Sequence, residues 1–429
     1  MRVSVIIPVW NGRTLITQCL TAVYNHSGRH LAEVICVDNA SGDDSAALIA
    51  AQFPQVTLLR QPVNLGFAGG VNAGLLAASG SLLVLLNQDC LVRAGWLDAL
   101  VTAVKTNPAI GIVGATIFDA DGAVNHAGAV LERPLAYGRH LTDNNAPGSQ
   151  PVEYVTGAVF GITRAVWENA GPFDEAFYPA YYEETDYCFR ARRAGFDIVY
   201  VPQAQADHLF SSREWQTKPI QHNASQHEMR YRFIAKHYSP DDLTAFFTAE
   251  SAAINGEVYF EQAIGRLIAA RQTLRRLDAI SASRERDLGE PVTPIRRRQL
   301  ETGFTQLLRH AFAAAEKTSL LRDVEPPAES DKTWTAVNQR LQQLQQQEYG
   351  LLTRIYLRPP DVTEPETKWQ RFQRLFIRRP FRFITGRDYY YQSQLNTVHV
   401  ARLDQIQKMQ RLIQRRLTLL ENLAEYDHD

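Results

Sequence analysis

The sequence has few cysteines, no long apolar run and almost no net charge. Only four cysteines occur in 429 residues, without a CxxC pair, which argues against a disulfide framework or a zinc site. No apolar run approaches the ~18 residues of a membrane span, and the apolar stretch in MRVSVIIPVW is too short for a signal peptide. A formal net charge of −1 does not predict nucleic-acid binding. We therefore expect a reduced, folded, cytoplasmic protein.

The composition changes near residue 240. Before it, short β-branched runs alternate with helical patterns; after it, strand patterns vanish and Gln, Arg and Leu dominate. A chain of 429 residues is also too long for one ordinary core. We predict an α/β domain over residues 1–240 and an all-helical region over 241–429, with breaks at Gly289–Pro294, Glu325–Asp331 and Arg358–Pro365.

The amino-terminal half predicts a mostly parallel sheet flanked by helices, because strands and helices alternate. The predicted strands are Val3–Ile7, Glu33–Val37, Val56–Arg60 and Leu82–Leu86, and the predicted helices are Thr14–Tyr24, Asp44–Gln52 and Phe67–Ala78. The following part is less regular, with short strands near Gly111–Ile117, Val155–Thr163 and Ile198–Val201 and a helix over Glu184–Ala194.

Two carboxylates stand at predicted strand ends, where open α/β sheets bind ligands. Asp38 closes the second strand in VICVDNASGDDS. It could accept the N3–H of a uracil or thymine ring, or cap the next helix through an Asx turn. Asp89 follows the buried Leu82–Leu86 run in NQD and could hold Mg²⁺ or Mn²⁺ on a nucleotide diphosphate. The alternative for Asp89 is a cap on a helix beginning near Arg93.

Other polar and glycine residues fit the same crevice. Asn64–Gly74 (NLGFAGGVNAG) could bring backbone amides to a phosphate, although it matches neither a P-loop nor GxGxxG, and helix packing is the alternative. His208 follows the strand near Ile198–Val201 and could complete a metal shell with Asp89, whereas a lone histidine is more often structural.

The segment YYEETDYCFR at Tyr181–Arg190 concentrates the acids that could act as a base. Glu183, Glu184 and Asp186 lie at the start of a predicted helix, behind tyrosines that could stack on a sugar. Crowded carboxyls raise one another's pKa and so tune a base. The alternative is that they interact favourably with the helix dipole.

Together these segments resemble one family. The resemblance rests on seven motifs in order: VSVIIPVWN (Val3–Asn11), VDNASGD with Asp38, NLGFAGGVNAG, LLNQD, TGAVFGITR (Thr156–Arg164), GPFDE (Gly171–Glu175) and YYEETDYCFRARRAGF, closing at His208. They resemble the family 2 glycosyltransferases with a GT-A fold, in the rhamnosyltransferase-like branch of bacterial surface polysaccharide synthesis, which includes lipopolysaccharide and O-antigen. The match covers about residues 1–238.

The resemblance implies an inverting, metal-dependent transfer from a UDP- or dTDP-sugar to a glycan or lipid-linked glycan. It implies Glu184 as the base, with Glu183 and Asp186 as rivals, and Asp89 with His208 as metal ligands. The residues expected at the nucleotide sugar are Pro8, Val9, Asn11, Asp38, Asn64, Gly66, Asn72, Asn87, Gln88, Asp89 and Gly157.

Two residues depart from the family's usual pattern. Asn87 replaces the first carboxylate of a D-x-D metal motif, so metal affinity is expected to depend on the nucleotide. Glu184 stands where Asp is usual, which is why its neighbours are rivals. A sugar-phosphate nucleotidyltransferase or a non-catalytic scaffold using the helical region are the alternatives. The former should have a Gly- and Arg-rich loop after its first strand, where this chain has Pro8–Gly12.

The region beyond residue 330 carries two further patterns. Short heptads, which predict intramolecular packing or an oligomeric coiled coil, run through Trp334, Val337, Leu341, Leu344, Leu351 and Ile355, and through Leu403, Ile406, Ile413, Leu417 and Leu420. Lys368–Arg416 is basic and aromatic, which is typical of contact with the inner leaflet of a membrane, or of packing.

Overall fold

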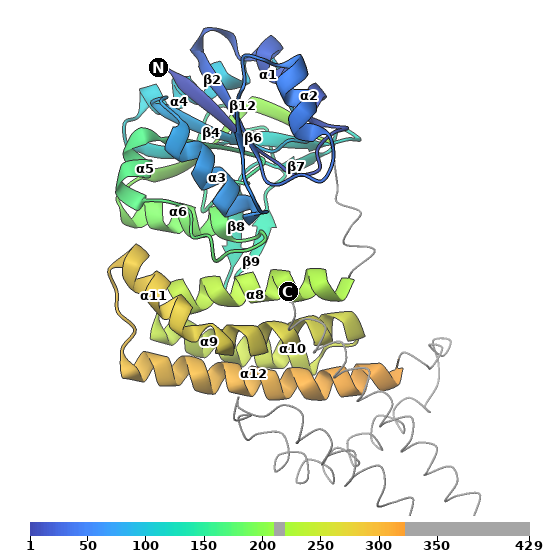
Figure 1. Cartoon of the computed structure of the whole chain (residues 1–429). Helices are drawn as coiled ribbons and strands as arrows, with labels where there is room; N and C mark the ends of the chain where they lie inside the picture. Colours follow the sequence, from blue (N-terminus) through green and yellow to red (C-terminus); the bar gives the residue numbers. More distant parts are fainter. Residues whose placement is uncertain (210–218, 322–429) are drawn as a thin grey trace, which may run out of the picture. The chain divides into compact units, whose positions relative to one another are not determined.

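The computed structural model describes residues 1–209 and 219–321 (Figure 1). Met1–Thr318 form one compact unit, and the predicted division near residue 240 stays a prediction. The heptads and the basic, aromatic stretch lie outside the described residues. Among the residues that are described, no helix combines the length and the apolar character needed to cross a bilayer.

A mixed sheet of ten strands forms the centre of this unit. Its main path is β10-β12-β6-β11-β4-β1-β2-β3, with β5 paired to β12 and β7 to β6. The strands are β1 (Val3–Val9), β2 (Leu31–Asp38), β3 (Thr57–Arg60), β4 (Leu82–Leu86), β5 (Cys90–Val92), β6 (Ile110–Asp119), β7 (Val124–His126), β10 (Gln150–Pro151), β11 (Val159–Thr163) and β12 (Asp197–His208). A separate hairpin pairs β8 (Ala129–Glu132) with β9 (Tyr137–His140).

The strands β1 to β4 are parallel, as predicted, so their carboxyl ends share one edge. In contrast, β11 runs antiparallel between β4 and β6. It begins at Val159 and not at Val155 as predicted. The preceding residues leave the ladder and form a turn, in which the Ala158 carbonyl accepts a hydrogen bond from the Asn87 amide (3.1 Å).

Helices cover both faces of the sheet. On one face lie α1 (Ile16–His26), α2 (Ser45–Gln52) and α4 (Trp96–Thr106), packed on a core that includes alternate residues of β1, such as Val5 and Ile7. On the other lie α3 (Gly66–Ala77), α5 (Arg164–Ala170) and α6 (Glu183–Arg193). There a Cβ on Gly74 of α3 would approach Ile6 to 2.3 Å, so glycine permits the close packing. A 3₁₀ turn, η1 (Gly28–His30), precedes β2.

The chain after residue 218 is helical as far as it is described. Its helices are α8 (Pro219–His237), α9 (Pro240–Asn255), α10 (Phe260–Arg275), α11 (Leu277–Leu288) and α12 (Pro294–Leu321), stacked against one another in Figure 1. The predicted break at Gly289–Pro294 is confirmed between α11 and α12. A bidentate pair between Arg230 and Glu250 (2.6 and 3.0 Å) ties α8 to α9 in the interior.

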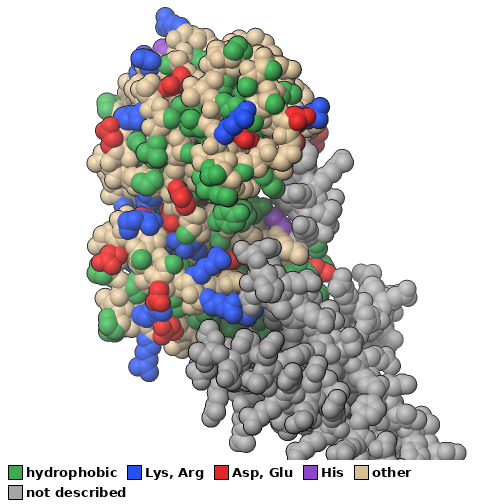
Figure 2. Space-filling view, in the orientation of Figure 1, with side chains coloured by type: hydrophobic (Ala, Val, Ile, Leu, Met, Phe, Trp, Pro, Cys, Tyr) green, Lys and Arg blue, Asp and Glu red, His purple; other side chains and the backbone are tan. Residues whose placement is uncertain are grey.

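The environment of the cysteines and the charges on the surface can be compared with the composition. All four cysteines are free, as the sequence predicts, and all four are buried. On the face drawn in Figure 2, basic and acidic side chains of the described residues are interspersed. This mixture agrees with the near-zero net charge and differs from the single-sign surface that binds nucleic acid.

Candidate active site

The first part of the site is the junction of β1 and β2. Val9 pairs with Asp38 in parallel register, so the two loops that follow emerge side by side. The backbone N–H of Asn11 donates to Ser41 Oγ (3.0 Å), and its side-chain Oδ1 accepts from the Gly42 N–H (2.8 Å). Asp38 is 6% exposed and accepts from the Ser41 N–H (3.3 Å). The two loops therefore form a single rim with Asp38 behind it.

Gln88 extends this rim to the end of β4. Its amide makes a reciprocal pair with the backbone of Trp10, accepting from the N–H and donating to the carbonyl at 3.0 Å each. Gly12 leaves room for it, since a Cβ there would lie 2.2 Å from Gln88 Oε1. The predicted ligand residue Gln88 thus shapes the loop with its amide, while the Trp10 ring, with the residue 46% exposed, is free to stack on a ligand.

The glycine-rich helix is held in place by an asparagine. Asn39 Nδ2 donates to the Gly66 carbonyl (2.8 Å), and Asn39 Oδ1 accepts from the Leu65 N–H (3.1 Å). Gly66 has φ +69°, and a Cβ there would meet the Pro179 carbonyl at 2.8 Å. Asn64 caps the turn by accepting from the Gly66 N–H (2.8 Å). These contacts set the start of α3 between the end of β2 and the segment that leads to α6.

The sequence places Asn39 in the polar turn that follows Asp38, but its hold on the start of α3 could not be predicted from the sequence. Asn72, in contrast, is predicted from the sequence to contact the nucleotide sugar. It is 4% exposed, and its amide donates to Phe173 O (3.0 Å) and Glu175 Oε1 (2.9 Å) and accepts from the Phe173 N–H (2.9 Å). Its predicted contact with the nucleotide sugar has no geometric support, because the loop at 173–175 engages both ends of the amide. Gly157 packs on the Phe67 ring, 3.1 Å from where its Cβ would lie.

Asp89 and His208 form a candidate metal centre. Antiparallel pairing of β5 with β12 sets His208 opposite Cys90, and His208 Nε2 lies 3.2 Å from Asp89 Oδ1. Apart from this ion pair with Asp89, the buried nitrogen has no hydrogen-bond partner among the described groups. Burial lowers the pKa of His208, but the adjacent Asp89 raises it further, to above its ordinary value. One carboxylate oxygen and one imidazole nitrogen suit Mn²⁺ or Mg²⁺ with the other positions left to a diphosphate.

Cys90 lies in the same group of potential ligand atoms, all within 4.8 Å of one another. Burial raises the pKa of its thiol well above the ordinary value. A thiol that stays protonated is a poor metal ligand. This leaves Asp89 and His208 as the candidate donors, and their role as metal ligands stays a prediction. The alternative cap role of Asp89 is unsupported because α4 begins only at Trp96, after Gly95.

The acidic cluster lies at the amino end of α6, as predicted. Tyr181 (φ 86°) and Tyr182 (φ 66°) both adopt the left-handed conformation just before the helix. Such conformations are costly for non-glycine residues and concentrate at functional sites. Tyr182 is fixed by donating its hydroxyl to the Ala136 carbonyl (2.7 Å). The strained turn places Glu183 and Glu184 in the first helical turn.

The two glutamates carry the perturbed acid chemistry of the cluster. Burial raises the pKa of Glu184 from 4.5 to about 7. Burial, followed by the charge of Glu184, raises the pKa of Glu183 well above its ordinary value. Each has an Oε2 without a hydrogen-bond partner among the described groups. Glu183 is 5% exposed and Glu184 only partly buried, so Glu184 is the more accessible of the two.

Asp186 differs from both glutamates. It is completely buried and contacts Arg190 Nε (2.9 Å), Lys236 Nζ (2.7 Å) and His237 Nε2 (2.7 Å). Burial alone would raise its pKa, but Lys236 and Arg190 hold it well below its ordinary value. A carboxylate that is ionised and enclosed by cations is poorly suited to take up a proton. The geometry favours Glu184 over Asp186 as the base.

Several known proteins are similar to this chain. The model of the family described as glycosyl transferase family 2 matches residues 4–161. An N-acetylglucosaminyl-diphospho-decaprenol L-rhamnosyltransferase of Mycobacterium tuberculosis is 26% identical in an alignment of 234 residues that covers 48% of this chain and 75% of that protein. Polypeptide N-acetylgalactosaminyltransferase 3 of Mus musculus is 25% identical over 48% of this chain and 36% of its own length. Among solved structures, a mannosyltransferase from Pyrobaculum calidifontis in complex with GDP-Man and Mn²⁺ aligns with a TM-score of 0.42 at 20% identity, over 75% of this chain and 88% of that one.

Proposed function

Since the chain carries a family 2 glycosyltransferase domain, we propose that it transfers a sugar from a UDP- or dTDP-sugar to a glycan or lipid-linked glycan, with inversion at the anomeric carbon. The observation that carries this proposal is the contrast within the acidic cluster. Glu184 has a pKa of about 7 and an unpartnered oxygen, whereas Asp186 is enclosed by cations. A general base works best when its pKa lies near the working pH.

In this proposal the junction of β1 and β2 binds the nucleotide. Asp38 accepts the N3–H of the base, and Pro8, Val9 and Asn11 line the pocket. The glycine-rich amino end of α3 offers backbone N–H groups to the diphosphate. Asp89 and His208 hold Mg²⁺ or Mn²⁺, which when bound offsets the negative charge of the diphosphate leaving group.

The chemical step moves one proton and exchanges one bond. Glu184 takes the proton of the acceptor hydroxyl while the oxygen of that hydroxyl attacks the anomeric carbon. The bond from that carbon to the diphosphate oxygen breaks, and its electron pair leaves with the nucleoside diphosphate. Attack from the face opposite to the leaving group gives the inverted product. Tyr178, 49% exposed beside the start of α3, is placed to stack on a sugar ring.

The acceptor and the setting are proposed from the rhamnosyltransferase of Mycobacterium tuberculosis, whose name specifies a diphospho-decaprenol acceptor. By this analogy the chain acts in bacterial surface polysaccharide synthesis at the inner face of the cytoplasmic membrane, and rhamnose is a candidate sugar. The family match favours glycosyl transfer over the nucleotidyltransferase alternative.

The test is a donor screen with the full chain. A panel of UDP- and dTDP-sugars is incubated with Mn²⁺ or Mg²⁺ and polyprenyl-diphosphate-linked acceptors, and nucleotide release is measured. We expect acceptor-stimulated release from one donor class, abolished by EDTA. Release that persists unchanged in EDTA would exclude the metal role. Formation of a nucleotide sugar from a sugar phosphate and a nucleoside triphosphate would instead support the nucleotidyltransferase.

A further inference from the structure

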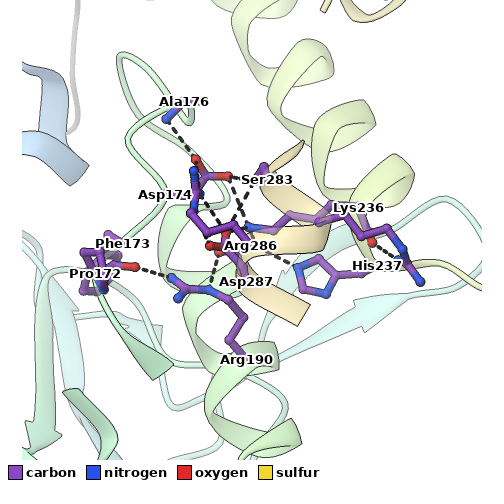
Figure 3. A network of polar contacts seen from close by, with 12 residues as sticks. Pro172, Phe173, Asp174, Ala176, Arg190, Lys236, His237, Ser283, Arg286 and Asp287 are labelled. Carbon is purple, nitrogen blue, oxygen red and sulfur yellow. Dashed lines mark hydrogen bonds and ion pairs between the residues drawn. The ribbon is translucent and has the colours of Figure 1, made fainter. Parts of the chain in front are cut away.

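Lys236 is a completely buried lysine near the carboxyl end of α8. Its Nζ contacts Asp174 (3.1 Å), Asp186 (2.7 Å) and Asp287 (2.7 Å). These carboxylates come from the loop after α5, from α6 and from α11. Figure 3 shows the lysine reaching in from α8 toward Asp174 and Asp287, with Arg190 and Ser283 close by. One amino group thus joins three separate segments of the chain.

Through Asp186, Lys236 acts on the helix that bears the proposed base. Asp186 lies two residues after Glu184 in the first turn of α6, and its N–H donates to the Tyr182 carbonyl (2.8 Å). Arg190, one turn further along α6, binds the other carboxylate oxygen of Asp186 (2.9 Å) and donates to the carbonyls of Ala170 and Pro172 (2.5 and 2.8 Å). The start of α6 is therefore fixed from both sides of Asp186.

Through Asp174, Lys236 acts on the glycine-rich helix. Asp174 is the neighbour of Phe173, whose backbone N–H and carbonyl are both bound by Asn72 of α3. Glu175, the next residue, accepts from the same Asn72 amide (2.9 Å). Lys236 thus connects the helix carrying Glu184 with the helix whose amino end faces the proposed diphosphate site.

We propose that Lys236 is a positioning residue for sugar transfer, which fixes the base-bearing start of α6 relative to α3 by bridging Asp186 and Asp174. This inference rests on the proposed function. It also makes α8 part of the catalytic unit, although the family match ends at residue 161.

The charges of the cluster allow a test that separates positioning from neutralisation. The three carboxylates face three buried cations, Lys236, Arg190 and Arg232, with Arg286 at the surface. Lys236→Met leaves the three carboxylates with only two buried cations, Arg190 and Arg232, because Arg286, which pairs with Asp287 (2.6 Å), is exposed. This loss of buried positive charge destabilises the fold. In the double variant Lys236→Met/Asp287→Asn, Asp174 keeps Arg232 (2.8 Å) and Asp186 keeps Arg190 (2.9 Å). The charge balance returns, but the bridge between Asp174 and Asp186 does not.

The experiment compares the wild type, both variants and Leu243→Ala in the full chain. Leu243 is completely buried in α9, a helix that supplies no residue to the cluster, and serves as a control for lost stability. Thermal unfolding, kcat, KM for the donor and amide hydrogen exchange over residues 181–187 are measured. We expect the double variant to recover most of the melting temperature lost by Lys236→Met. Its kcat stays at least tenfold below wild type with KM for the donor within about threefold, and exchange over 181–187 stays fast, because a mispositioned base affects the chemical step.

Recovery of kcat and of exchange protection together with melting temperature would overturn the proposal, since Lys236 would then only neutralise charge. Slow kcat in Leu243→Ala at temperatures where it is folded would also overturn it. The exchange measurement decides the positioning claim even if no donor is turned over by the wild type. Absence of all turnover would count against the proposed function alone.

Discussion

Replacing Glu184 by Gln is expected to abolish most activity and at the same time to stabilise the protein at alkaline pH. The amide keeps the shape of the side chain but cannot accept a proton, and losing a positioned base typically costs about 10²–10⁴ in rate. KM for the donor should change little, because the nucleotide contacts lie at β1, β2 and α3. In the wild type, kcat should rise as pH increases through about 7, since the base must be ionised.

The stability effect follows from the same raised pKa. Burial raises the pKa of Glu184 from 4.5 to about 7, so the folded state holds its proton more tightly than the unfolded state. The contribution of Glu184 to folding stability is therefore fully present below about pH 4.5 and is lost as pH rises through about 7. A rise of this size corresponds to at most ~3.4 kcal/mol, and the partial exposure of Glu184 reduces this figure. Because Gln cannot ionise, the variant avoids this loss.

Urea unfolding near pH 4.5 and near pH 8 measures the difference. We expect equal free energies of unfolding for wild type and Glu184→Gln at the lower pH, and a more stable variant at the higher pH. Glu183→Gln serves as the control for kinetics and should retain more of kcat. A Glu184→Gln variant that keeps wild-type kcat, or one that is less stable than wild type near pH 8, would refute the assignment of Glu184 as a base with a raised pKa.

Three further changes test other parts of the site. Asp89→Ala should leave the fold intact and remove metal-dependent nucleotide binding, measured by calorimetry with UDP or dTDP and Mn²⁺; binding that is equal in both proteins would contradict the metal role. Gly66→Ala should weaken nucleotide binding and cost about 1–2 kcal/mol in urea unfolding, because Gly66 has φ +69° and a Cβ would lie 2.8 Å from the Pro179 carbonyl; an unchanged midpoint would show that the turn adapts. A chain ending near Asp361 should lose cosedimentation with anionic vesicles if the basic stretch beyond it contacts membranes, and equal binding by both forms would count against that role.

The first half of the fold was predictable because its signals are local. Every predicted helix and strand before residue 90 is present, with ends within two residues. Strand ends such as Asp38 and Asp89 could be located from the apolar runs before them. The antiparallel insertion of β11 could not, because its direction is set by pairing with β4 and β6, which are distant in sequence.

The site was predictable by residue type but not by environment. Three acids within one helical turn look equivalent in sequence. However, Lys236 and His237, some fifty residues later, bind Asp186 and give it an environment different from that of Glu184. Likewise Asn72 and Gln88 have side chains suited to a ligand, but their amides bind distant backbone. Such differences depend on tertiary contacts that no local pattern encodes.

The central claim is that Glu184 acts as the general base of an inverting sugar transfer. The most direct test is an NMR assignment of the glycosidic bond formed from the active donor by wild type, Glu183→Gln and Glu184→Gln. The account predicts a product with the anomeric configuration opposite to that of the donor, formed by wild type and Glu183→Gln and lost in Glu184→Gln. A product with retained configuration, or one formed equally well by Glu184→Gln, would contradict it.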